Sequence, residues 1–187
     1  MDMRAAFREA VQVCLPRARI VADHFPVVQP VGKALAQVWG RCARSQEGRG
    51  TLKGHRHLFL RAVEDLEPEE EERRTHLAEG FPDLAAAWRH KEALRRWYAT
   101  ASGTDAAAGL DAWIASVQQE GPAELVQARS AFHAWREEIL AFFAFLPTRI
   151  SNGFVQGKNN RTKTLMRQAY GYRNHQHLRL RILLEVA

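Results

Sequence analysis

Apolar residues recur at intervals of three and four along most of the 187-residue chain, and prolines and glycines interrupt the pattern. Such spacing is typical of helices that bury one face. It predicts helices over residues 4–14, 27–44 and 57–66, an acidic helix opening at Pro68, and further helices over 84–98, 105–119, 123–146, 154–167 and 175–185. Residues 45–54 are rich in glycine and charge and predict a loop.

One short segment, residues 19–22, departs from the helical pattern. Arg19-Ile20-Val21-Ala22 is β-branched at its centre, which is typical of a buried strand that ends at Asp23. A strand needs neighbours in a sheet, and the rest of the chain predicts none. We therefore expect the chain to begin inside a domain whose other strands precede Met1.

The composition is that of a folded protein. Hydrophobic residues make up 46% of the chain and charged residues 26%, which excludes a disordered chain. No apolar run approaches the roughly 20 residues of a membrane span. The N-terminus also lacks the apolar core of a signal peptide, so we expect a cytoplasmic protein without a membrane partner.

Charge is distributed unevenly, and the net charge of +6 favours nucleic acid as a partner. Residues 64–72 hold seven carboxylates, whereas residues 149–181 hold eight lysines and arginines and no acid. We therefore expect the positive surface at the C-terminal end. Cys14 and Cys42 are isolated, so the sequence indicates neither a disulfide framework nor a zinc site.

Three segments together resemble one protein family. They are Asp2-Met3 followed by residues 18–25; residues 83–94 with the later Asp111-Ala112-Trp113; and Ser-Asn-Gly-Phe-Val-Gln-Gly-Lys-Asn-Asn-Arg-Thr-Lys over residues 151–163, followed by residues 167–174. On these motifs, which span essentially the whole chain, the sequence resembles the ISL-three family of DDE-type insertion-sequence transposases. The third segment is highly specific.

The resemblance implies a fold class and an activity. The fold would be α-rich α/β, a truncated ribonuclease H-like catalytic domain with a large helical insertion. Residues 1–26 would be a remnant of the ribonuclease H-like core, residues 27–147 the insertion, and residues 148–187 the C-terminal helices of the core. The family cuts and joins DNA at insertion-sequence ends, and its Asp-Asp-Glu carboxylates hold two Mg²⁺ or Mn²⁺ ions.

The resemblance also implies catalytic positions. Asp2 stands at the family's second Asp and is the candidate metal ligand, while Gln156 stands where the family has Glu. The first Asp belongs upstream of Met1, and Pro26 stands where the family usually has His. A neutral amide cannot offset the charge of two metal ions as a carboxylate does. We therefore expect impaired Mg or Mn binding and no catalysis by the isolated chain.

The third segment also holds the candidate DNA contacts, which are amides and cations able to reach phosphate or sugar oxygens: Asn152, Lys158, Asn159, Asn160, Arg161, Lys163, Arg167 and Arg173. Lys163 and Arg167 are four residues apart and share a helix face. The alternative for the cations is a solvated basic face, and for the amides a capping or turn role. The lack of acids among them favours phosphate contact.

Two classes of function follow. The chain could be a transposase fragment, either decayed or completed by a split partner that supplies the missing Asp. It could instead be a non-catalytic DNA-binding or regulatory protein derived from a transposase. The partner in both is DNA at insertion-sequence ends, with self-association or association with an intact transposase as further possibilities. A helical interaction module with no DNA role is the third alternative.

Overall fold

The structure is a computed structural model that describes residue 3 and residues 5–145, 153–169 and 171–186. The chain divides into two compact units, residues 1–149 and residues 150–187. All regular secondary structure in the described residues is helical. The α-rich composition predicted from the sequence is therefore confirmed.

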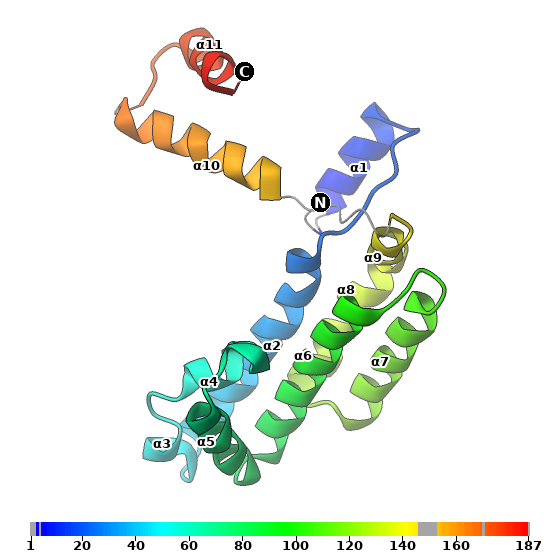
Figure 1. Cartoon of the computed structure of the whole chain (residues 1–187), viewed down its shortest axis with the longest axis vertical. Helices are drawn as coiled ribbons and strands as arrows, with labels where there is room; N and C mark the ends of the chain where they lie inside the picture. Colours follow the sequence, from blue (N-terminus) through cyan, green and yellow to red (C-terminus); the bar gives the residue numbers. More distant parts are fainter. Residues whose placement is uncertain (1–2, 4, 146–152, 170, 187) are drawn as a thin grey trace. The chain divides into compact units, whose positions relative to one another are not determined.

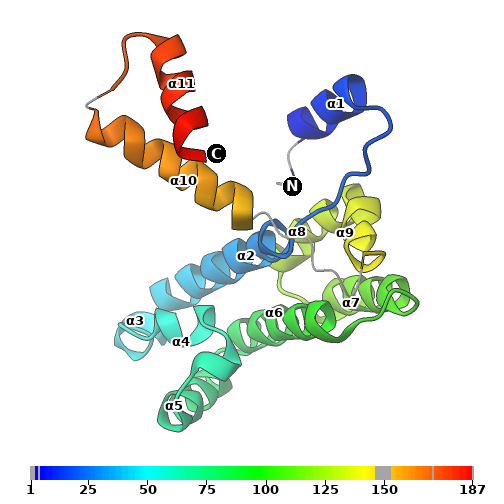
Figure 2. The ribbon, with the colours of Figure 1, turned by 45° about the horizontal axis from the view of Figure 1, so that its top comes forward.

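The first unit is a helical assembly (Figure 1). Its helices are α1 (Ala5–Cys14), α2 (His24–Arg44), α3 (Gly48–Thr51), α4 (Arg56–Leu60), the 3-10 helix η1 (Val63–Asp65), α5 (Pro68–Glu79), α6 (Pro82–Thr100), α7 (Ala106–Glu120), α8 (Ala123–Ala134) and α9 (Arg136–Phe143). Helix α2 lies beside both α6 and α8, as two views show (Figures 1 and 2). The second unit contains α10 (Gly153–Gln168) and α11 (His175–Val186).

Two apolar cores hold the first unit together, and α2 belongs to both. Val27 and Val31, in the first half of α2, are fully buried in one core. Leu35 and Val38, in the second half, are fully buried in the other. Helix α6 is shared in the same way, because its end contributes to the first core and its beginning to the second. Each core residue of this size stabilises the fold by about 1.5–3 kcal/mol relative to an exposed side chain.

The strand predicted over residues 19–22 is wrong. These residues form no regular secondary structure, and the backbone N–H of Ala22 donates to the carbonyl of Glu138 in α9, at 2.9 Å, and not to another strand. A strand forms only where a second strand satisfies its backbone groups, and the described residues contain none. The segment instead leads directly into α2, where the Asp23 carboxylate accepts a hydrogen bond from the backbone N–H of His24.

The single helix predicted over residues 57–66 is also wrong. Helix α4 ends at Leu60, and the chain turns at Arg61 before η1 begins. The ammonium group of Lys91 lies against this turn and donates hydrogen bonds to the carbonyls of Phe59, at 2.9 Å, and Arg61. A buried cation thus satisfies carbonyls that would otherwise lack partners at the helix end.

The long helix predicted over residues 123–146 is broken. Helices α8 and α9 meet at Trp135, whose backbone angles are φ −118° and ψ 18°. The indole ring is buried, and the guanidinium of Arg8 lies 3.8 Å from its centroid. Arg8 also pairs with Glu138 at 2.7 Å and donates to the carbonyl of Ala134 at 2.7 Å. Arg8 therefore fastens α1 to this break.

The amphipathic helix predicted at the N-terminus is confirmed as α1, although none of its side chains is buried. None of the helices in the described residues has the length and apolar character that a membrane crossing demands.

Candidate nucleic-acid interface

Helix α10 carries most of the candidate DNA contacts, and its end is well defined. The backbone N–H of Gly171 donates to the carbonyl of Met166 at 3.0 Å, and Gly171 has a φ of +100°, which glycine adopts without strain. The next helix, α11, begins at a side-chain cap. The Asn174 Oδ1 atom accepts hydrogen bonds from the backbone of Gln176 and His177, at 2.8 and 3.4 Å.

The register of α10 separates two faces. Leu165 is buried and marks the inner face. Asn159, Asn160, Lys163 and Arg167 are exposed, and at 3.6 residues per turn they fall on the side of the helix opposite Leu165. We call these four residues the polar stripe. It presents two amides and two cations to solvent and contains no acid.

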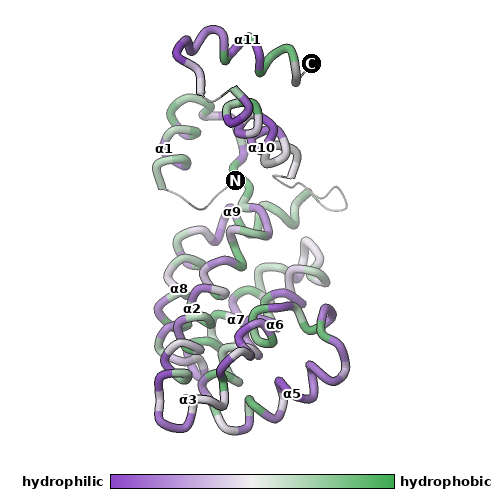
Figure 3. The backbone as a smooth tube through the Cα atoms, turned by 90° about the vertical axis from the view of Figure 1, so that its left-hand side faces the viewer, coloured by the Kyte–Doolittle hydropathy of each residue, from purple (hydrophilic) through white to green (hydrophobic). Residues whose placement is uncertain are grey.

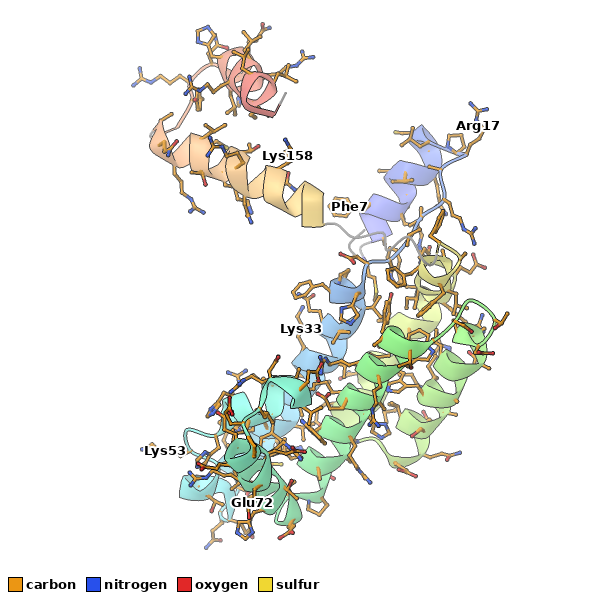
Figure 4. All side chains as sticks on the ribbon, in the orientation of Figure 1. Phe7, Arg17, Lys33, Lys53, Glu72 and Lys158 are labelled. Atoms are coloured by element: carbon orange, nitrogen blue, oxygen red, sulfur yellow. The ribbon has the colours of Figure 1, made fainter. Side chains whose placement is uncertain are left out.

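The other predicted cations lie elsewhere. Arg161 and Lys158 precede Leu165 by four and seven residues, so they lie on its side of the helix; Arg161 is exposed and Lys158 half-buried. Figure 4 labels Lys158 on α10. Arg173 is exposed in the connection between α10 and α11. The predicted set is thus not one continuous face.

Two of the predicted site residues are not described. The catalytic candidate Asp2 and the DNA-contact candidate Asn152 lie outside the described residues. Gln156 belongs to α10, four residues before Asn160 and seven before Lys163. This spacing puts position 156 in line with the polar stripe.

The described residues do not fit a two-metal centre. No three His, Cys, Asp or Glu side chains in this part of the chain lie close enough to hold a metal ion together. Helix α10 has no carboxylate in its sequence, and position 156 offers an amide. Hard cations such as Mg²⁺ bind carboxylates in preference to a neutral amide alone. The chemistry available on α10 is therefore hydrogen bonding and positive charge.

A charged network in the first unit serves the fold instead. Lys91 and Glu92 are both buried and pair at 2.8 Å, and Arg95 joins Glu92 at 2.8 Å. Burial lowers the pKa of Lys91 below its usual value, and the hydrogen bond to Glu92 offsets only part of that change. The hydrogen bond from Arg95 lowers the pKa of Glu64 to about 2. This network attaches α4 and η1 to α6.

A second pair of contacts attaches α5. The guanidinium of Arg61 pairs with Glu70 at 2.8 Å, and the ring of His57 lies 3.6 Å from the same carboxylate. Further along α5, the guanidinium of Arg74 lies 3.6 Å from the ring of Trp88 in α6. These contacts anchor the acidic helix α5, which Figure 3 shows mostly in the hydrophilic colour.

Comparison with known proteins gives a consistent picture. A family model described as Transposase matches residues 1–182. The transposase for insertion sequence element IS1001 of Bordetella parapertussis is 25% identical over 187 residues, covering 97% of this chain and 45% of that protein. The transposase for insertion sequence element IS1557 of Mycobacterium tuberculosis is 28% identical over 151 residues, covering 79% of this chain and 33% of that protein.

The chain therefore spans less than half the length of these curated relatives. No solved structure matches it significantly.

Proposed function

The chain belongs to the ISL-three family of DDE-type transposases, and we propose that it carries out one specific part of the transposition reaction. The chain supplies a DNA-backbone contact beside the third catalytic position of a ribonuclease H-like domain. Its DNA is the end of an insertion sequence, and it does not cut that DNA by itself. The observation that supports the proposal is the register of α10, in which position 156 is in line with the polar stripe.

The polar stripe has suitable chemistry for this contact. Lys163 and Arg167 are exposed cations one turn apart, so both can meet phosphates of one strand. Asn159 and Asn160 add amide groups that can donate to phosphate oxygens. Such contacts position the protein on DNA without reading its sequence.

Gln156 supports the absence of cutting. An amide retains one oxygen ligand but not the negative charge that helps two divalent cations to approach each other. The same substitution favours the second candidate function, a non-catalytic regulator that occupies insertion-sequence ends or joins an intact transposase. In both functions the polar stripe binds DNA.

The first experiment measures DNA binding by the full 187-residue chain. Fluorescence anisotropy with a 30-base-pair duplex is recorded from 50 to 200 mM KCl for the wild type, for Lys163→Gln/Arg167→Gln, and for the control Arg89→Gln/Arg96→Gln. Arg89 and Arg96 are exposed on α6 and match the charge removed. The slope of log K against log salt is negative, and we expect it to become less steep in the stripe variant, by about 0.9 for each phosphate that the protein no longer neutralises. Equal slopes for all three proteins would contradict the proposal.

The second experiment tests cutting. Supercoiled plasmid is incubated with Mn²⁺ and the wild type, Gln156→Glu or Asp2→Ala. We expect no nicking by the wild type. Nicking that disappears in Asp2→Ala would show a working centre and refute the proposed inactivity. Nicking by Gln156→Glu alone would identify the amide as the cause of inactivity.

A further inference from the structure

We infer that the connection between α2 and α4 is a second DNA-backbone contact, carried by the first unit and independent of α10. The residues are Arg44, Arg49, Lys53 and Arg56, which we call the basic tip. The inference rests on the proposed function only in taking DNA as the partner. It assigns a phosphate-binding surface to the helical part of the chain, which the family resemblance identifies only as an insertion.

The arginines of the first unit divide into those that pair with a carboxylate and those that do not, and the arginines of the basic tip belong to the second group. Five arginines of the unit form ion pairs with carboxylates at 2.5–2.9 Å: Arg8, Arg41, Arg61, Arg95 and Arg136. The four side chains of the basic tip are exposed and form no ion pair with any described residue. Their charges are therefore available to an external anion.

The four cations are close together in the sequence and on a connected part of the fold. Residues 44–56 contain one carboxylate, Glu47, against the four cations. Helices α3 and α4 both contact α2, and the Arg56 guanidinium lies 5.8 Å from the ring centroid of Trp39 in α2. Figure 4 shows Lys53 pointing away from the ribbon.

The backbone of the basic tip is held in place. Leu52, between Arg49 and Lys53, is fully buried in the core that it shares with Leu58. A Cβ atom at Gly48 would lie 1.9 Å from the carbonyl oxygen of Cys42, so the chain passes too close to α2 for any other residue. The tip is thus ordered before it meets a ligand, which reduces the entropy cost of binding.

A tight turn then exposes the charges. Arg49 and Gly50 have backbone angles of −63°, 113° and 92°, −46°, close to a type II turn with glycine at the position that needs positive φ. A second positive φ, 83°, occurs at Gly54. Nothing lies within 4 Å of a Cβ built on either glycine, so both turns face open space. A phosphate backbone can approach Arg49 and Lys53 closely there.

Acidic helix α5 limits the orientation of the DNA. Glu69, Glu71 and Glu72 are exposed on α5, which packs against α4. Phosphates near these carboxylates would be repelled, and like charges placed together cost binding free energy. The duplex therefore meets the tip from the side of α2 and α3. A neutral or basic peptide partner would gain nothing from four unpaired cations.

The experiment compares three full-length variants in the same anisotropy assay. The tip variant is Arg44→Gln/Arg49→Gln/Lys53→Gln/Arg56→Gln, and the stripe variant is Lys163→Gln/Arg167→Gln. The control Arg17→Gln/Lys33→Gln/Arg89→Gln/Arg96→Gln removes four exposed charges elsewhere in the unit. Far-UV circular dichroism and a urea midpoint equal to that of the wild type establish that each variant is folded.

We expect the negative salt slope of the tip variant to become less steep by about 0.9 for each removed cation that meets a phosphate in the wild type, while the control stays within experimental error of the wild type. The stripe and tip effects on the slope should add in a fourth variant, which carries the two stripe and the four tip substitutions together. A tip variant with the wild-type slope would overturn the inference. If the stripe variant still weakens binding, the proposed function survives that result.

Three other outcomes are also decisive. If the tip and control variants weaken DNA binding equally, only net charge matters and the tip is not a site. If the wild-type slope is flat, the proposed function and the inference both fail. If the tip variant loses binding to phosphatidylserine vesicles but keeps the wild-type slope on DNA, the tip is a lipid-binding surface and the inference is overturned.

Discussion

Lys91 offers a quantitative test of how the first unit is held together. Its ammonium group is buried, donates to the carbonyls of Phe59 and Arg61, and pairs with Glu92 at 2.8 Å. Lys91→Met keeps the length of the side chain and removes every one of these interactions. Three carbonyls, those of Phe59, Leu60 and Arg61, then lose this donor, and a buried carboxylate loses one of its two cations.

The magnitude follows from these losses. A buried polar group left without a partner costs about 1–3 kcal/mol, and removing one member of a buried ion pair costs about 3–5 kcal/mol. The two figures describe overlapping interactions and are not added. Arg95 still neutralises Glu92 at 2.8 Å, so we expect a loss of about 3 kcal/mol. This is a large fraction of the roughly 5–15 kcal/mol that stabilises an ordinary domain.

The assay is urea unfolding of the full chain, followed by circular dichroism at 222 nm. Lys33→Met is the matched control, because Lys33 is exposed on α2 and should change stability by less than about 0.5 kcal/mol. Glu92→Gln added to Lys91→Met removes the uncompensated charge and should recover part of the loss. A Lys91→Met protein within about 0.5 kcal/mol of the wild type would refute this account of the network.

Three further predictions concern other parts of the first unit. Arg8→Ala should release α1, so deuterium uptake over residues 5–14 should rise while uptake in α2 stays constant; unchanged uptake in α1 would show that Arg8 is not its anchor. Arg95 lowers the pKa of Glu64 from 4.5 to about 2, so this carboxylate stabilises the fold above pH 4.5 and stops doing so as the pH falls through about 2. The difference in urea midpoint between the wild type and Glu64→Gln should shrink over that range, and a constant difference would contradict the prediction. Gly109→Ala would bring a Cβ atom 2.5 Å from the indole ring of Trp97 and should lower the free energy of unfolding by about 1–3 kcal/mol. Gly32→Ala has open space in α2 and should raise it by up to about 1 kcal/mol. Thermal unfolding measures both changes, and equal effects would count against the packing argument.

The helices were predictable because their signals are local. Pro82 at the start of α6 and the apolar spacing of Leu84 and Leu94 act within the helix itself. Pro68, in the first turn of α5, likewise signals the start of its own helix. Each of these helices begins within two residues of its predicted position.

The breaks were not predictable because their causes are distant in sequence. Trp135 leaves the helical region of the backbone where Arg8, 127 residues earlier, lies against its ring. The turn at Arg61 is stabilised by Lys91, 30 residues later. The sequence at these breaks contains neither proline nor glycine to signal them. The segment around Ile20 resembled a strand because β-branched residues indicate a local preference and not the presence of a neighbouring strand.

The candidate interface was partly predictable. Lys163 and Arg167 were expected to share a face because they are four residues apart, and α10 is helical over both. The division between the polar stripe and the side of Lys158 needed the position of buried Leu165. The basic tip could not be predicted because the sequence does not tell which arginines of the first unit are neutralised by carboxylates of distant elements. The ion pairs in the structure show this.

Helix α2 runs through both apolar cores for 21 residues, or about 30 Å at 1.5 Å per residue. Neither core can melt without exposing half of a helix that the other core still needs, so their unfolding is cooperative. The first unit should therefore give one calorimetric transition, although its apolar interior is divided. For the same reason, neither half can be excised as a miniature domain, and a lesion in one core will lower the stability of the other.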